Sequence, residues 1–259
     1  MWNLPTPRPQ KEIISMIYAS VGTLRNIEGP DSCFSPTAGF TDAKREQYGF
    51  LTKLEKKALY WMAKKIPPWI NPDHLTALGF IAMILAGTSY ALSGNDSRFL
   101  HAASVLIFIN WLGDSLDGTL ARYRNKLRPR YGFYVDHILD TFSTFFLISG
   151  VALSGYMSPF VAGSLLIAYL MLSIQVYLAT YTIGKFKLSF SWFSPTELRV
   201  LLIVGNWALI SHREITIFNT DVLLFDLGGA IGVIMIAFIL IFSTVKNIAY
   251  LYKKEKILR

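Results

Sequence analysis

Four aspartates in a hydrophobic part of the chain offer the clearest chemistry in the sequence: Asp114, Asp117, Asp136 and Asp140. Asp114 and Asp117 stand at i,i+3, and Asp136 and Asp140 at i,i+4, so each pair shares one face of a helix. An ionised carboxylate near a bilayer centre costs roughly 2.5–3.5 kcal/mol, so four unpaired ones would cost about 10 kcal/mol. We therefore expect a cationic partner. Two such faces that meet across a short loop would form an all-oxygen pocket for a hard divalent cation.

The alternative partners for these acids are the arginines of the loop that follows the first pair. This loop carries Arg122, Arg124, Arg128 and Arg130. The paired spacing of the acids favours the cation pocket over simple pairing with these side chains.

The elements that must position the acids are hydrophobic helices. The chain has 259 residues, of which 53% are hydrophobic and 16% charged, with a mean hydropathy of +0.39. The apolar residues fall in long runs without strand alternation, which is typical of membrane helices. The sequence predicts an all-α, polytopic membrane protein with six transmembrane helices, at about 75–93, 99–121, 132–153, 158–183, 197–211 and 222–245. The fifth of these spans is short.

Lysine and arginine placement predicts how these helices are oriented. Basic side chains gather before the first span and after the second, fourth and sixth, whereas the intervening loops offer only Arg98 and Arg213. The positive-inside rule then puts both termini and the acid-bearing helix ends in the cytoplasm. This bias also explains most of the net charge of +8, so no nucleic-acid partner is needed. Cys33 is the only cysteine, which excludes an intrachain disulfide.

Four regions are predicted along the chain. Residues 1–48 form a cytoplasmic N-terminal segment of unknown role, and residues 247–259 form a basic cytoplasmic tail. Residues 71–246 form the six-helix transmembrane domain, which carries the four aspartates and their chemistry. Residues 49–70 carry apolar side chains at helical spacing with lysines at the complementary positions, which predicts an amphipathic helix on the membrane surface. Packing of that helix against the protein's own cytoplasmic face is the alternative.

The acids belong to a longer pattern that joins the second and third spans. It reads Asp114-x-x-Asp117-Gly118-x-x-Ala121-Arg122, then residues 123–131, then Gly132-x-x-x-Asp136-x-x-x-Asp140. Gly118, Ala121 and Gly132 are small residues expected at a crowded helix–helix approach, where a flat ligand could lie close to the backbone. Ordinary small-residue packing of membrane helices is the alternative for them. Arg122 offers a forked donor for a phosphate or a base edge.

This pattern resembles the signature of the CDP-alcohol phosphotransferase family, with all eight fixed positions and their spacing matched. The resemblance implies six helices around a polar cavity, transfer of a phospho-substituent from a CDP-linked donor to an alcohol, and release of CMP. It implies one or two Mg²⁺ or Mn²⁺ ions on the four aspartates. The cytidine and phosphate site would use Asp117, Gly118, Ala121, Arg122 and Gly132. Asp140 would be the general base, and a homodimer in contact with membrane lipids is expected.

Two flanking segments bear on the substrates. Asp136 is followed by His137, as in choline and ethanolamine phosphotransferases, and Ser194-Pro195-Thr196-Glu197 is similar to a segment of the same branch. These hints favour CDP-choline or CDP-ethanolamine with diacylglycerol. The alternative is CDP-diacylglycerol with a polar alcohol such as inositol phosphate, glycerol phosphate or serine. His137 could be a second catalytic base or could only hydrogen-bond a carboxylate or a backbone carbonyl.

The sequence also departs from the family pattern at one position and allows other functions. Pro72-Asp73-His74-Leu75-Thr76 is similar to a family segment that usually has Asn where this chain has Asp73. Intramembrane acids also occur in ion or proton transporters, but that function leaves the Gly-x-x-Ala-Arg element unexplained. A prenyltransferase or a non-catalytic scaffold are further alternatives. Four glycines could allow close packing in a dimer: Gly205, Gly228, Gly229 and Gly232.

Overall fold

The structure, a computed structural model, describes residues 52–183, 195–217 and 219–255, all within one compact unit, Ala43–Arg259. The predicted segment 1–48, the first residues of the amphipathic helix and the end of the basic tail lie outside the described residues. The elements are α2 (Thr52–Lys65), α3 (Pro72–Ser93), α4 (Arg98–Tyr123), α5 (Pro129–Ser154), α6 (Pro159–Ile183), α7 (Pro195–Ser211), β1 (Glu214–Ile217), β2 (Thr220–Leu223) and α8 (Leu224–Lys254).

The helices follow the predicted hydrophobic spans closely. Five of the described helices, α3, α4, α5, α6 and α8, are long and apolar enough to cross a membrane. Helix α7 has 17 residues, so it is about 25 Å long, shorter than the roughly 30 Å hydrocarbon core of a bilayer. The protein is therefore a multi-pass integral membrane protein, and a sixth span at α7 stays a prediction.

Two details differ from the predicted all-α fold. Residues Glu214–Leu223 form a short antiparallel hairpin, in which Glu214 pairs with Leu223 and Ile217 with Thr220. Its β-branched residues favour strands, and Asn219 has a positive φ of 62°, which suits a tight turn. Helix α8 continues to Lys254, so the first part of the predicted tail extends the last helix.

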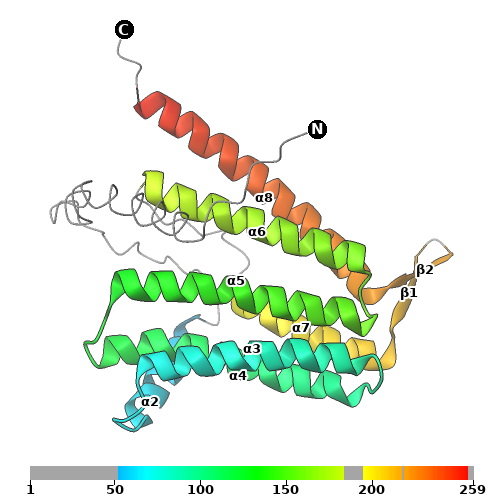
Figure 1. The fold of residues 1–259 in the computed structure, drawn as a ribbon, viewed down its shortest axis with the longest axis horizontal. Coiled ribbons are helices and arrows are strands. Elements are labelled where there is room, and N and C mark those ends of the chain that lie inside the picture. The colour runs from blue at the N-terminus through cyan, green and yellow to red at the C-terminus, as the bar shows by residue number, and fades with distance from the viewer. Residues whose placement is uncertain (1–51, 184–194, 218, 256–259) are drawn as a thin grey trace, which may run out of the picture. The chain divides into compact units, whose positions relative to one another are not determined.

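Helices α3, α4 and α5 run side by side, with α3 in contact with both others (Figure 1). Glycines allow this approach. A Cβ on Gly113 of α4 would lie 2.7 Å from the carbonyl oxygen of Leu75, and Gly87 of α3 faces Gly150 of α5 even more closely. The backbones of α3 and its two neighbours therefore meet directly, as small residues allow in membranes.

A buried polar network attaches α7 to α3 and α4. The Tyr90 hydroxyl donates to Asn206 Oδ1 at 2.7 Å, and Asn206 Nδ2 donates to Ser104 Oγ at 3.0 Å. Tyr90 and Asn206 are fully buried. Because unpaired polar groups are costly in a membrane interior, this network specifies where α7 lies along its neighbours.

Helices α6 and α8 contact each other and turn large apolar side chains outward. Phe160 is 83% exposed and Phe238 is 71% exposed, as expected of lipid-facing residues. The glycines considered for a dimer are mostly used within the chain. A Cβ on Gly229 would meet Val161, one on Gly232 would meet Leu165, and one on Gly205 would meet Phe225. The homodimer stays a prediction.

Helix α2 packs against the protein itself. Its Leu59 and Ala63 are buried in one cluster with Leu116 and Leu120 of α4. Arg124, just after α4, donates to the carbonyl oxygens of Ile66, Pro67 and Ile70 at 3.0, 2.9 and 2.5 Å, which fixes the α2–α3 turn. The exposed face carries Tyr60 and Trp61 with lysines stacked over their rings. Contact of that face with lipid remains a prediction.

Candidate active site

Three of the four predicted metal ligands converge. Asp114, near the end of α4, and Asp136 and Asp140, near the start of α5, each offer a carboxylate oxygen within 4.8 Å of the others. The short connection between the two helices brings the i,i+3 and i,i+4 faces together. This trio fits a hard divalent cation, because carboxylate oxygens are the ligands that Mg²⁺ and Mn²⁺ prefer.

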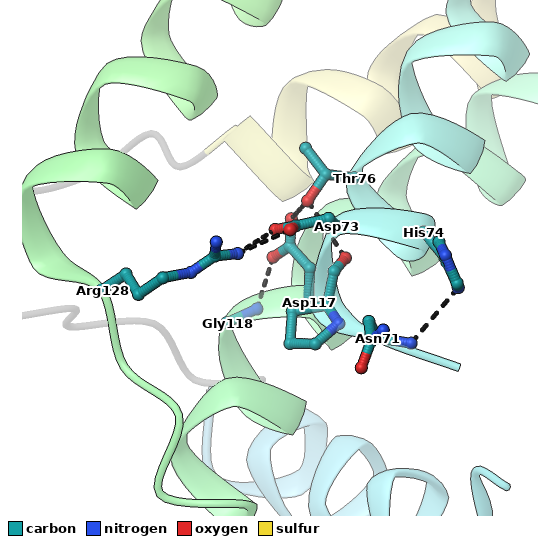
Figure 2. Close-up of polar contacts among 8 residues, drawn as sticks. Asn71, Asp73, His74, Thr76, Asp117, Gly118 and Arg128 are labelled. Carbon is teal, nitrogen blue, oxygen red and sulfur yellow. Dashed lines mark hydrogen bonds and ion pairs between the residues drawn. The ribbon is translucent and has the colours of Figure 1, made fainter. Parts of the chain in front are cut away.

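Asp117 lies outside this trio and is held by its neighbours on α3 and α4. Thr76 Oγ1 donates to Asp117 Oδ2 at 2.6 Å, and the Gly118 N–H donates to Oδ1 (Figure 2). All four acids nevertheless line one cavity. Its other lining residues are Thr76, Gly79, Phe80, Asn110, Leu139 and Ser143. Thr76 belongs to the flanking segment Pro72–Thr76, and nothing in its spacing predicts this contact with Asp117.

Arg199 is a partner of the acids that the sequence analysis missed. Its guanidinium reaches from α7 and donates to Asp114 Oδ2 at 2.8 Å. Its side chain is only 13% exposed. One signal could have found it, because a charged side chain inside an apolar span usually pairs or serves a site. Of the arginines that follow the first acid pair, Arg124 binds the backbone carbonyls of the α2–α3 turn.

A second arginine of this group, Arg128, binds an acid at the start of α3. Arg128 binds Asp73 at 2.6 Å, both side chains being about half exposed, and this hydrogen bond raises the pKa of Arg128 above its ordinary value (Figure 2). Asp73, where the family usually has Asn, thus pairs with the loop before α5. At the start of α3, the Asn71 N–H donates to His74 Nδ1 at 3.3 Å, as in a capping box.

Two of the predicted nucleotide-binding residues, Gly118 and Gly132, have open space above them. Within the described part of the chain, a Cβ on Gly118 would meet only the end of Arg122 at 3.8 Å, and one on Gly132 would meet nothing within 4 Å. The expectation that these two glycines lie at a crowded helix approach is therefore wrong. The crowded positions are Gly87, Gly113 and Gly150, and the space over Gly118 and Gly132 is free for a ligand.

His137 contacts its own helix and Tyr177 of α6. Its Nδ1 lies 2.7 Å from the Phe133 carbonyl oxygen, and its ring stacks on Phe133 and packs edge-on against Tyr177. Asp136 is 3.8 Å from the same nitrogen. His137 does not line the acid cavity. This geometry favours the alternative in which His137 hydrogen-bonds a backbone carbonyl.

Comparisons with known proteins define the class. The family CDP-alcohol phosphatidyltransferase matches over residues 69–248, which is most of the chain. The protein belongs to this family of membrane transferases of phospholipid synthesis, whose members use CDP-linked donors and are generally metal-dependent.

Two curated proteins are similar to part of the chain. The chain is 34% identical to a CDP-diacylglycerol–serine O-phosphatidyltransferase of Encephalitozoon cuniculi over 46% of its own length and 32% of the relative's. It is 31% identical to an archaetidylinositol phosphate synthase of Pyrococcus horikoshii over 33% of its length and 43% of the relative's. The chain thus spans less than half of either relative.

A solved structure shares the fold. The phosphatidylinositol phosphate synthase of Mycobacterium tuberculosis with CDP-DAG bound superposes with a TM-score of 0.53 at 15% identity, covering 80% of this chain and all of that one. Neither of these two curated relatives is named as a choline or ethanolamine phosphotransferase, the branch that His137 and residues 194–197 suggested.

Proposed function

We propose that this protein transfers a phosphatidyl group from CDP-diacylglycerol to a polar alcohol, with a divalent cation, and releases CMP. The observation that carries the proposal is the convergence of Asp114, Asp136 and Asp140 in one cavity. The serine O-phosphatidyltransferase is named for CDP-diacylglycerol and the solved structure has CDP-DAG bound, which supports this donor. The name of the archaetidylinositol phosphate synthase supports a polar alcohol as the acceptor.

The reaction balances as a single displacement. The alcohol oxygen forms a bond to the phosphorus that carries the diacylglycerol, and the bond from that phosphorus to the oxygen of CMP breaks. Bound at Asp114, Asp117, Asp136 and Asp140, one or two Mg²⁺ or Mn²⁺ ions would neutralise the pyrophosphate and stabilise the leaving group.

Side chains of the protein would accept the proton of the alcohol and bind the nucleotide. Asp140 would accept the proton of the alcohol, since a carboxylate on the cavity wall can serve as a general base. Gly118 and Gly132 would leave room for the nucleotide, and Ala121 and Arg122, which follow Gly118 on α4, would contact it. Thr76 holds Asp117 in place through its hydroxyl.

An assay of CMP release from the purified protein with Mg²⁺ tests the proposal. One arm contains CDP-diacylglycerol with serine, glycerol phosphate or inositol phosphate, and the other contains CDP-choline or CDP-ethanolamine with diacylglycerol. We expect release that depends on the alcohol in the first arm alone. Release only in the second arm would reverse the assignment of the donor.

The orientation and assembly are also proposals. The lysine and arginine bias supports a cytoplasmic active site with both termini on the same side. Protease protection of a terminal tag in sealed vesicles would test this orientation. Mass photometry in nanodiscs would test the proposed homodimer.

A further inference from the structure

Asn110 is an acid-cavity residue that the proposed mechanism does not use. It lies on α4 one turn before Asp114, is 6% exposed, and lines the same cavity as the four aspartates. Its Oδ1 is the only buried side-chain oxygen or nitrogen without a hydrogen-bond partner in the described part of the chain. A buried acceptor left without a partner costs free energy, so a ligand that supplies one would be favoured.

The neighbouring backbone fixes which amide atom is free. Asn110 Nδ2 donates to the Gly79 carbonyl oxygen at 3.0 Å, across the close contact of α3 and α4. Turning the amide over would bring two acceptor oxygens together, so the carbonyl oxygen must be the atom left for something else.

A second buried asparagine shows how this residue type is otherwise used in the fold. Asn206 is fully buried, and both of its amide atoms are paired, Oδ1 with Tyr90 and Nδ2 with Ser104. Asn110 is also buried, but among the described residues only its amide nitrogen has a hydrogen-bond partner. The difference is that Asn110 borders the acid cavity, whereas Asn206 is enclosed among helices.

We propose that Asn110 Oδ1 is a further ligand of the cation bound by Asp114, Asp136 and Asp140, a role that rests on the proposed function. Asn110 and Asp114 stand at i,i+4, so they share one face of α4. Amide oxygens are ordinary ligands of hard cations. A neutral oxygen also adds coordination without adding a fifth negative charge to a cavity within the membrane, where each charge is costly.

Binding of Mn²⁺ to the purified full chain, followed by the spin-resonance signal of the free ion, tests this role. In Asn110→Leu we expect Mn²⁺ affinity to fall on the order of tenfold, a loss typical of removing a group that supports a metal site. Asn110→Asp keeps an oxygen but loses the amide donor to Gly79, and should bind Mn²⁺ at least as tightly as the natural chain. Asn206→Leu, the matched control, should lower the thermal midpoint and leave Mn²⁺ affinity unchanged.

The outcomes separate this proposal from the proposed function. Unchanged Mn²⁺ affinity in Asn110→Leu would overturn the ligand role, even if the KM for the alcohol rose. A loss in Asn110→Asp as large as in Asn110→Leu would also overturn it, because the contact with Gly79 would then be the one that matters. Should Asn110→Leu not fold, a loss of Mn²⁺ affinity of about tenfold in folded Asn110→Asp would by itself overturn the ligand role. No Mn²⁺ binding by the natural chain would overturn the metal-dependent function itself, and this role with it.

Discussion

The Arg199 guanidinium lies 2.8 Å from a carboxylate oxygen of Asp114, although the two residues are 85 positions apart. The contact joins the start of α7 to the acid-bearing end of α4. A cation that binds Asp114 must share this carboxylate with Arg199 or replace the guanidinium. The strength of this ion pair therefore lowers the affinity for the cation, because the interaction with Arg199 must be weakened or lost when the cation binds.

Replacing Arg199 by Met should have two opposite effects. The metal-free protein should lose about 1–3 kcal/mol of stability, because the partly buried Asp114 carboxylate loses its charged partner. Mn²⁺ affinity should rise several-fold, because the ion no longer competes with the guanidinium. Thermal unfolding with and without Mn²⁺ measures both effects, with Arg199→Lys as the charge-conserving control. Equal stability and affinity in Arg199→Met and the natural chain would contradict this account.

Asp140→Asn should reduce turnover by about 10²-fold or more, the usual contribution of a general base. The comparison is made at saturating Mn²⁺, because Asp140 is also one of the three clustered acids. Near-full turnover together with normal Mn²⁺ binding would exclude Asp140 as the base.

His137→Gln should change turnover by less than tenfold and leave the pH profile of kcat in place. The reason is that the imidazole contacts the Phe133 carbonyl and the α6 aromatic Tyr177 and does not line the acid cavity. Loss of a titration near neutral pH in the kcat profile of this variant would restore His137 as a candidate base.

Thr76→Val should weaken Mn²⁺ binding or donor binding by about tenfold, because Asp117 loses the hydroxyl that holds it at 2.6 Å. Thr76→Ser keeps the hydroxyl and should retain most of the activity. KM for CDP-diacylglycerol and Mn²⁺ affinity are the quantities to compare. Equal values for Val and Ser would mean that the hydrogen bond does not position Asp117.

Two glycine-to-alanine changes should distinguish a glycine required for helix packing from one that leaves space for the donor. Gly87→Ala should greatly reduce the yield of folded protein, because the new methyl group would meet the backbone of α5 at Phe146. Gly132→Ala should fold normally, because no described residue lies within 4 Å of the added carbon, and should raise the KM for the donor. Size-exclusion profiles in detergent and KM measurements test the pair, and equal folding yields would contradict the packing assignment.

The sequence was enough to predict the helices and the two acid pairs, because hydrophobic run length and i,i+3 or i,i+4 spacing are local properties. The contacts of Arg199 and Asn110 depend on how α7 and α3 pack against α4, which no local spacing encodes. Glycine has two uses in a membrane, close helix packing and space for a ligand. The signature glycines, Gly118 and Gly132, therefore could not be distinguished from Gly87 and Gly150 by residue type alone.

The buried network at Asn206 limits how far α7 can move. Arg199 and Asn206 are two turns apart on the same face of α7, and both bind α4, through Asp114 and Ser104 respectively. Tyr90 also ties Asn206 to α3. If a cation displaces Arg199, the Asn206 contacts still hold the middle of the helix. Asn206 would then act as a fixed point, so that an outward displacement of α7 would be largest in the turns nearest the acids.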